Sequence, residues 1–138
     1  MSAESHAVDG PARTSRHFNL ISAALAFAMW GGWAFHVNRG ASPWVSGLTQ
    51  GIGSFVITLM MVRAVAWLYH RLSPFPLGLV WPAVIVVAVT GTCLATAHAL
   101  VGTANIAKTI APALSVAFAF NIYTAIKLGK IVPGAAAS

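Results

Sequence analysis

Residues 77–101 read LGLVWPAVIVVAVTGTCLATAHALV, a run of twenty-five residues without a lysine, arginine, aspartate or glutamate. At about 1.5 Å per residue, a helix of this length exceeds the roughly 30 Å hydrocarbon layer of a bilayer. The run lacks the alternation of polar and apolar residues that is typical of a transmembrane β-strand. It therefore predicts a transmembrane helix, which satisfies its backbone polar groups within one segment.

Three further apolar runs of similar length predict three more spans. They lie at residues 18–37, 46–69 and 105–128. Turn-forming residues such as Pro43, Pro74 and Gly102 separate neighbouring runs. The sequence thus predicts an all-α polytopic membrane protein, a bundle of four transmembrane helices arranged as two helical hairpins. The expected organisation is a disordered polar tail at 1–17, a transmembrane domain at 18–128 and a short C-terminal tail at 129–138.

The composition of the whole chain excludes the common soluble classes. Of 138 residues, 58% are hydrophobic and 7% are charged, and the mean hydropathy is +0.79. Soluble domains carry about a quarter charged residues, and a soluble surface this apolar would aggregate. We therefore exclude a soluble globular protein, a disordered chain and a nucleic-acid-binding module.

The charge distribution predicts how the helices insert. The chain contains eight lysines and arginines and only two acidic residues, Glu4 and Asp9. Four spans place both termini on one side, which would hold five of the basic residues and leave two opposite. The first group is Arg13, Arg16, Arg71, Lys127 and Lys130, and the second is Arg39 and Lys108. The positive-inside rule then predicts cytoplasmic termini, in a bacterial inner membrane with anionic lipids as partners.

Small residues spaced about four apart are the candidates for close helix packing. They are Gly47, Gly51, Gly91, Ala95, Ala111, Ser115 and Ala119. Such positions let the backbones of lipid-immersed helices approach each other. They predict packing within the bundle, or alternatively a seam with other membrane subunits or with copies of the same chain.

Six residues are candidates for binding a ligand or a lipid headgroup. They are His36, Arg39, His98, Asn105, Lys108 and Arg63. The first five flank the two hairpin connections, where their convergence would form a cationic cluster suited to an anion. Arg63 lies seven residues before the end of its run. Its side chain would either snorkel to lipid phosphates or contact Asn121, a carbonyl group of the fourth helix or an anionic ligand.

The sequence offers little support for a cofactor or for catalysis. His36 and His98 allow a haem b alternative, because histidines from two helices can be axial ligands of the iron. A zinc site is less favoured, since structural zinc needs four nitrogen or sulfur ligands. The chain has no acid to complete a Ser-His-Asp triad and no phosphate-binding glycine motif. We therefore expect no cofactor, no metal and no enzymatic activity.

Three functions are compatible with these features. The first is an accessory or assembly subunit of a larger membrane complex. The alternative is a small oligomeric transporter or flippase for an anionic or lipid-linked substrate, because coupling to cations usually uses an intramembrane carboxylate and none follows Asp9. The third is a redox subunit that binds haem b.

Overall fold

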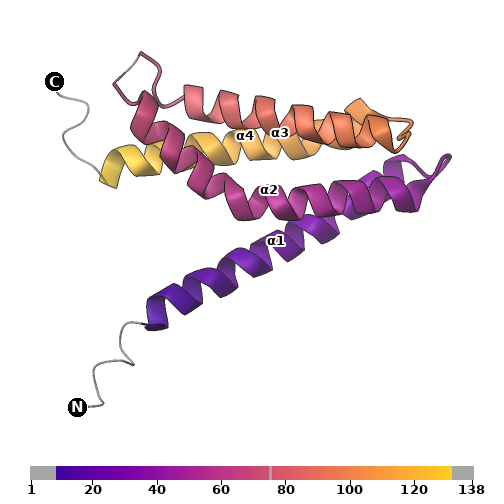
Figure 1. Ribbon diagram of the computed structural model, residues 1–138, viewed down its shortest axis with the longest axis horizontal. Coiled ribbons are helices and arrows are strands. Elements are labelled where there is room, and N and C mark those ends of the chain that lie inside the picture. Colours follow the sequence, from indigo (N-terminus) through magenta and orange to yellow (C-terminus); the bar gives the residue numbers. More distant parts are fainter. Residues whose placement is uncertain (1–8, 75, 132–138) are drawn as a thin grey trace.

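Four α-helices form the protein in the computed structural model, which describes residues 9–74 and 76–131 (Figure 1). The helices are α1 (Asp9–Val37), α2 (Pro43–Leu72), α3 (Trp81–Leu100) and α4 (Ile106–Ile131). Each contains a segment long and apolar enough to cross a membrane. Residues 9–74 and 76–131 contain no strand. The predicted all-helical fold with four candidate spans is therefore confirmed.

Consecutive helices run in opposite directions, which gives the protein two distinct ends (Figure 1). The α1–α2 and α3–α4 connections, residues 38–42 and 101–105, lie together at what we call the hairpin end. The start of α1, the α2–α3 connection and the end of α4 lie at the opposite, terminal end. Helix α1 lies along α2 at the hairpin end and diverges from the other helices toward the terminal end (Figure 1).

The first helix begins at Asp9, nine residues before the predicted start. The prediction of a disordered tail is therefore wrong for residues 9–17, and residues 1–8 and 132–138 of the two predicted tails lie outside the described residues. The error has a physical reason. An apolar run marks only the part of a helix that lies in lipid, here within Ser15–Val37, whereas Asp9 and Pro11 are compatible with the first turn of a helix.

The third helix begins at Trp81, four residues after the predicted start. Leu77 adopts a left-handed conformation with φ 62°, and its carbonyl oxygen accepts hydrogen bonds from the amides of Val80 and Trp81. A turn therefore precedes α3, and Pro82 occupies its first turn. The remaining helix ends lie within three residues of the predicted ones.

Glycines bring α1 and α2 into close contact. A Cβ atom on Gly31 would lie 3.3 Å from the Cα atom of Gly51, and one on Gly51 would lie 2.9 Å from the ring of Phe27. In the other hairpin, a Cβ atom on Gly91 would lie 3.0 Å from a methyl group of Leu114. Gly31 and Gly51 leave no room for a side chain, so the backbone of α1 approaches that of α2 as glycine-mediated membrane packing predicts. At Gly91 the neighbour is the end of the Leu114 side chain, which would have to shift slightly.

The small residues of α4 do not share this role. Ala111, Ser115 and Ala119 are exposed, and Ala95 on α3 is half-buried. The interpretation of the α4 residues as packing positions within the chain is therefore wrong. The four-residue spacing specifies one face of a helix but does not specify what that face contacts.

Candidate functional site

A chain of hydrogen-bonded polar side chains runs through the interior of the hairpin end. Its members, which we call the buried polar chain, are in order Ser46, Thr103, His98, Gln50 and Ser54. Ser46 lies 3.1 Å from Thr103, and Thr103 lies 2.8 Å from Nδ1 of His98. Gln50 lies 2.8 Å from Nε2 of His98 and 3.3 Å from Ser54. His98 and Gln50 have no exposed surface. Residues from α2, α3 and the α3–α4 connection thus form one continuous hydrogen-bonded path inside the bundle.

The hydrogen bonds of this chain have a consistent direction. The Oε1 atom of Gln50 can only accept, so Nε2 of His98 donates to it. In the neutral ring, Nδ1 then accepts from the hydroxyl group of Thr103. Thr103 in turn accepts from Ser46. At the other end, the amide nitrogen of Gln50 donates to Ser54. Every link is satisfied, as a buried polar network requires.

A second set of polar contacts attaches α1 to α4 at the hairpin end. The Nδ2 atom of Asn38 donates to Thr109 Oγ1 at 2.9 Å, and its Oδ1 atom accepts from the backbone amide of Asn105 at 3.1 Å. The indole of Trp33 donates to the carbonyl oxygen of Lys108 at 3.0 Å. These bonds fix the hairpin end of α1 and leave its other half without an equivalent attachment to α4 among the described residues.

A lateral cleft of about 590 Å³ separates the diverging half of α1 from the other three helices. We define the lateral cleft by its lining residues, which are Phe18, Asn19, Ser22, Leu25, Ala26, Met29 and Trp30 of α1, Ser54, Ile57, Thr58, Met61 and Val62 of α2, Thr90 and Leu94 of α3, and Ala113, Leu114, Val116, Ala117 and Phe120 of α4. Most are apolar. Leu25 on one wall is 65% exposed and Val116 on the other is 55% exposed, so the cleft opens sideways between α1 and α4.

The buried polar chain ends in the lateral cleft. Ser54 is the last member of the chain and is also a lining residue of the cleft. The polar lining is small and consists of Asn19, Ser22, Ser54, Thr58 and Thr90. The protein therefore combines a closed polar core near the hairpin end with an open apolar cleft toward the terminal end.

Comparisons with known proteins give no family for this chain. No family model, no curated protein and no solved structure matches it. The chemistry of the buried polar chain and of the lateral cleft is therefore the basis for inferring a function.

The structure divides the predicted cationic cluster into two groups. His98 is a buried member of the polar chain, and Asn105 contacts Asn38 through its backbone. The side chains of three others, His36, Arg39 and Lys108, are exposed at the same end and form no hydrogen bond among the described residues. The five residues share one end of the bundle but do not form one site.

Arg63 and Asn121 do not meet. Arg63 is exposed on α2, directly after the cleft residue Val62. Asn121 is fully buried on α4, and neither its Nδ2 nor its Oδ1 atom has a hydrogen-bond partner among residues 9–74 and 76–131. The hydrogen bond considered between them is therefore absent, and exposure of Arg63 leaves its side chain able to reach lipid phosphates.

The haem alternative meets a geometric obstacle at His98. Both ring nitrogens of His98 form hydrogen bonds of 2.8 Å within the chain, so a bond to iron would require one of them to break. His36 is exposed, with its ring centroid 6.4 Å from that of Trp33. Among residues 9–74 and 76–131, no group of three or more His, Cys, Asp or Glu side chains is placed to hold a metal ion.

Sequence reasoning missed most of the polar residues that form the site. Ser46, Gln50, Ser54 and Thr58 recur every four residues along α2, which places them on one face. This polar stripe could have been found by its spacing, but only the neighbouring glycines at 47 and 51 were assigned a role, in helix packing. Asn38 and Thr109 gave no such signal, because their contact joins α1 to α4 across a separation of 71 residues.

Proposed function

We propose that this protein is a non-enzymatic integral membrane protein that binds one apolar chain of a lipid in the lateral cleft, as a carrier or flippase for an anionic or lipid-linked substrate. The cleft is the observation that supports this function. Its volume of about 590 Å³ lies within the roughly 300–1,000 Å³ typical of small-molecule sites. It lies within the apolar segments of all four helices and is open on one side.

The lining of the cleft suits a single extended lipid chain. An acyl or isoprenoid chain would be surrounded there by apolar side chains such as Leu25, Met29 and Val116.

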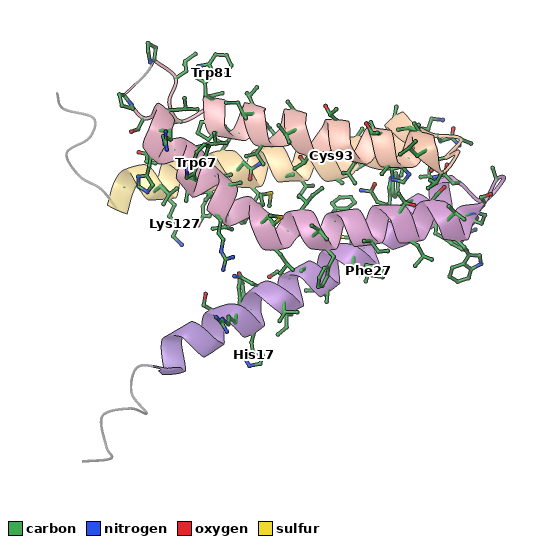
Figure 2. The ribbon with its side chains drawn as sticks, viewed as in Figure 1. His17, Phe27, Trp67, Trp81, Cys93 and Lys127 are labelled. Carbon is green, nitrogen blue, oxygen red and sulfur yellow. The ribbon has the colours of Figure 1, made fainter. Side chains whose placement is uncertain are left out.

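The charge of the terminal end favours an anionic lipid. Exposed basic side chains lie there, among them Arg16, Arg71 and Lys127, and Figure 2 shows His17 and Lys127 at this end. We place both termini in the cytoplasm of a bacterial cell, on the basis of the positive-inside rule. The cleft then opens toward the inner leaflet, where basic residues attract anionic headgroups.

An accessory subunit of a larger membrane complex is the second candidate. It is supported by the exposed face of α4 that carries Ala111, Ser115 and Ala119, since small residues on a lipid-facing surface allow a second helix to approach closely. Native mass spectrometry after mild detergent extraction tests it. A bound partner protein or a second copy is expected under this candidate, and a monomer that carries only lipid contradicts it.

Lipid binding can be tested with a phospholipid that carries a photoreactive group near the end of its acyl chain. After reconstitution and irradiation, we expect cross-links to lining residues such as Leu25 and Val116. Ala26→Trp and Ala117→Trp should fill the cleft and reduce cross-linking there. Ala88→Trp adds the same bulk to an exposed position of α3 and is the control. Equal cross-linking in all three variants would exclude the cleft as a lipid site.

The proposed topology has its own test. Reporter fusions after Ser42, Pro74 and Ala104 should report the periplasm, the cytoplasm and the periplasm, respectively. A cytoplasmic signal after Ser42 would overturn the orientation and would make the cleft open toward the outer leaflet instead.

A further inference from the structure

A polar stripe on α2 extends from the hairpin end into the lateral cleft. It consists of Ser46, Gln50, Ser54 and Thr58, of which the first three are buried and the last two line the cleft. Twelve residues of helix rise about 18 Å, more than half of the roughly 30 Å hydrocarbon layer. The stripe therefore supplies hydrogen-bonding groups across a depth of the membrane where an apolar bundle would offer none.

The stripe is joined by two residues from outside α2. His98 bonds to Gln50, and Thr103 bonds to both His98 and Ser46. Buried polar groups are costly to place in a membrane, and hydrogen bonds between membrane helices contribute little net stability. Apolar residues of similar size would pack the same helices. A path of polar groups that includes an ionisable histidine is instead typical of a route for a substrate through a membrane protein.

The chemistry of the route indicates which headgroup it fits. It presents hydroxyl groups, one amide and one imidazole, and no carboxylate side chain occurs in residues 10–138. A positively charged headgroup would find no counter-charge along it. A phosphate group could accept from these hydroxyl, amide and imidazole groups once they exchange their present partners within the chain. Exposed Arg63 lies beyond the cleft, and exposed Arg39 and Lys108 lie at the hairpin end.

From this placement we infer that the stripe, with His98 and Thr103, is the path along which an anionic phosphate headgroup crosses between the leaflets while the lipid chain occupies the lateral cleft. The inference rests on the proposed lipid-binding function and adds to it the route of the headgroup and its phosphate chemistry. Ser54 joins the two parts, since it belongs to both the buried polar chain and the cleft lining. The other members of the chain are buried and bonded to one another, so a passing headgroup would have to replace these hydrogen bonds with its own.

The test is a lipid-flipping assay on the reconstituted full-length chain. Liposomes contain fluorescent phosphatidylglycerol, which is anionic, or fluorescent phosphatidylcholine, which is zwitterionic, and dithionite quenches the label in the outer leaflet. We expect the protein to expose phosphatidylglycerol faster than phosphatidylcholine. The double variant Ser54→Ala/Thr58→Val should slow this exposure about tenfold or more, through the loss of two hydrogen bonds to the headgroup. Gln50→Leu should also slow the exposure of phosphatidylglycerol.

A matched control removes the same groups from elsewhere in the bundle. Ser115 and Thr92 are exposed, and each hydroxyl group bonds to a carbonyl oxygen of its own helix. Ser115→Ala/Thr92→Val should therefore flip phosphatidylglycerol at the original rate. Equal rates for this control and the Ser54→Ala/Thr58→Val variant would overturn the path, and equal rates for the two lipids would overturn the headgroup class.

The photo-cross-linking assay separates failure of the path from failure of lipid binding. Cross-linking that persists in the Ser54→Ala/Thr58→Val variant while flipping is lost supports the path. Cleft cross-linking without any flipping by the unmodified protein overturns the path and leaves lipid binding intact. The absence of both cleft cross-linking and flipping overturns the two proposals together.

Discussion

The carbonyl oxygen of Gly47 lies 2.9 Å from the position that a Cβ atom on Gly31 would occupy. The relationship is reciprocal, because a Cβ atom on Gly47 would lie 3.1 Å from the carbonyl oxygen of Gly31. Because the atoms nearest to such a Cβ atom belong to the backbone of the other helix, no side chain could move aside to make room for it. The contact lies on the α1–α2 interface, from which α1 diverges to form one wall of the lateral cleft.

We predict that Gly31→Ala destabilises the protein. The new methyl group would overlap the backbone of α2, and overpacking of this kind costs about 1–3 kcal/mol. Gly32 is the matched control, because a Cβ atom there meets nothing within 4 Å, so Gly32→Ala should not lower stability. Thermal melting of both variants in lipid nanodiscs checks the prediction. Equal melting of the two would show that α1 and α2 are less closely packed than the glycine contact indicates.

Asn38 offers a second prediction, on the attachment of α1 to α4. Asn38→Ala removes the bonds to Thr109 and to the amide of Asn105. Thr109 keeps its bond to the carbonyl oxygen of Asn105, but the part-buried Asn105 amide loses its partner at a cost of about 1–3 kcal/mol. The same change at Asn105, whose exposed side chain contacts the carbonyl oxygen of Val37 at 3.5 Å, should have little effect. Spin labels on α1 and α4 should report a wider distance distribution for Asn38→Ala, and an unchanged distribution would contradict the role of Asn38.

The sequence predicted the fold well because the bilayer imposes strong constraints. A chain with 7% charged residues and four apolar runs has few alternatives to four spanning helices. The helix ends were less predictable. Leu77 continues an apolar run by hydropathy, yet its left-handed conformation begins the turn that precedes α3. A leucine in this run gives no indication of a positive φ.

The site was harder to predict than the fold. His98 and Asn105 were identified because isolated polar residues near a hairpin stand out, but Gln50 was hidden within an apolar run that already predicted a helix. The direction in which a helix face points depends on contacts with distant segments. Ser54 and Ser115 illustrate this. Ser54 lies on the polar stripe of α2 and Ser115 on the small-residue stripe of α4, with the same four-residue spacing, yet the first is buried and the second is exposed.

A substitution of Asn121 is expected to stabilise the protein, unlike the changes at Gly31 and Asn38. Its amide is fully buried, and neither of its polar atoms has a hydrogen-bond partner within the described part of the chain. Asn121→Leu keeps a similar volume and removes the unsatisfied group, so the free energy of unfolding should rise by about 1–3 kcal/mol. Asn19→Leu alters an exposed amide and is the control, with little change expected. A loss of stability in Asn121→Leu would show that the amide has a partner in the membrane, such as water.

Substitutions of Arg63 distinguish a general contact with lipid from binding of a headgroup in a specific pocket. Its side chain is exposed, and a charge inside a membrane segment is tolerated when a long side chain reaches the headgroup region. Lysine also reaches that region. The free energy of unfolding of Arg63→Lys should therefore lie within about 0.5 kcal/mol of that of the unmodified protein, the range of ordinary surface substitutions. Arg63→Leu, which removes the charge, should leave folding intact and reduce the preference for anionic lipid in the flipping assay. If Arg63→Lys were instead as impaired as Arg63→Leu, the planar guanidinium group would be required, as for a bidentate contact with phosphate, and Arg63 would belong to a built headgroup site and not to the general basic surface.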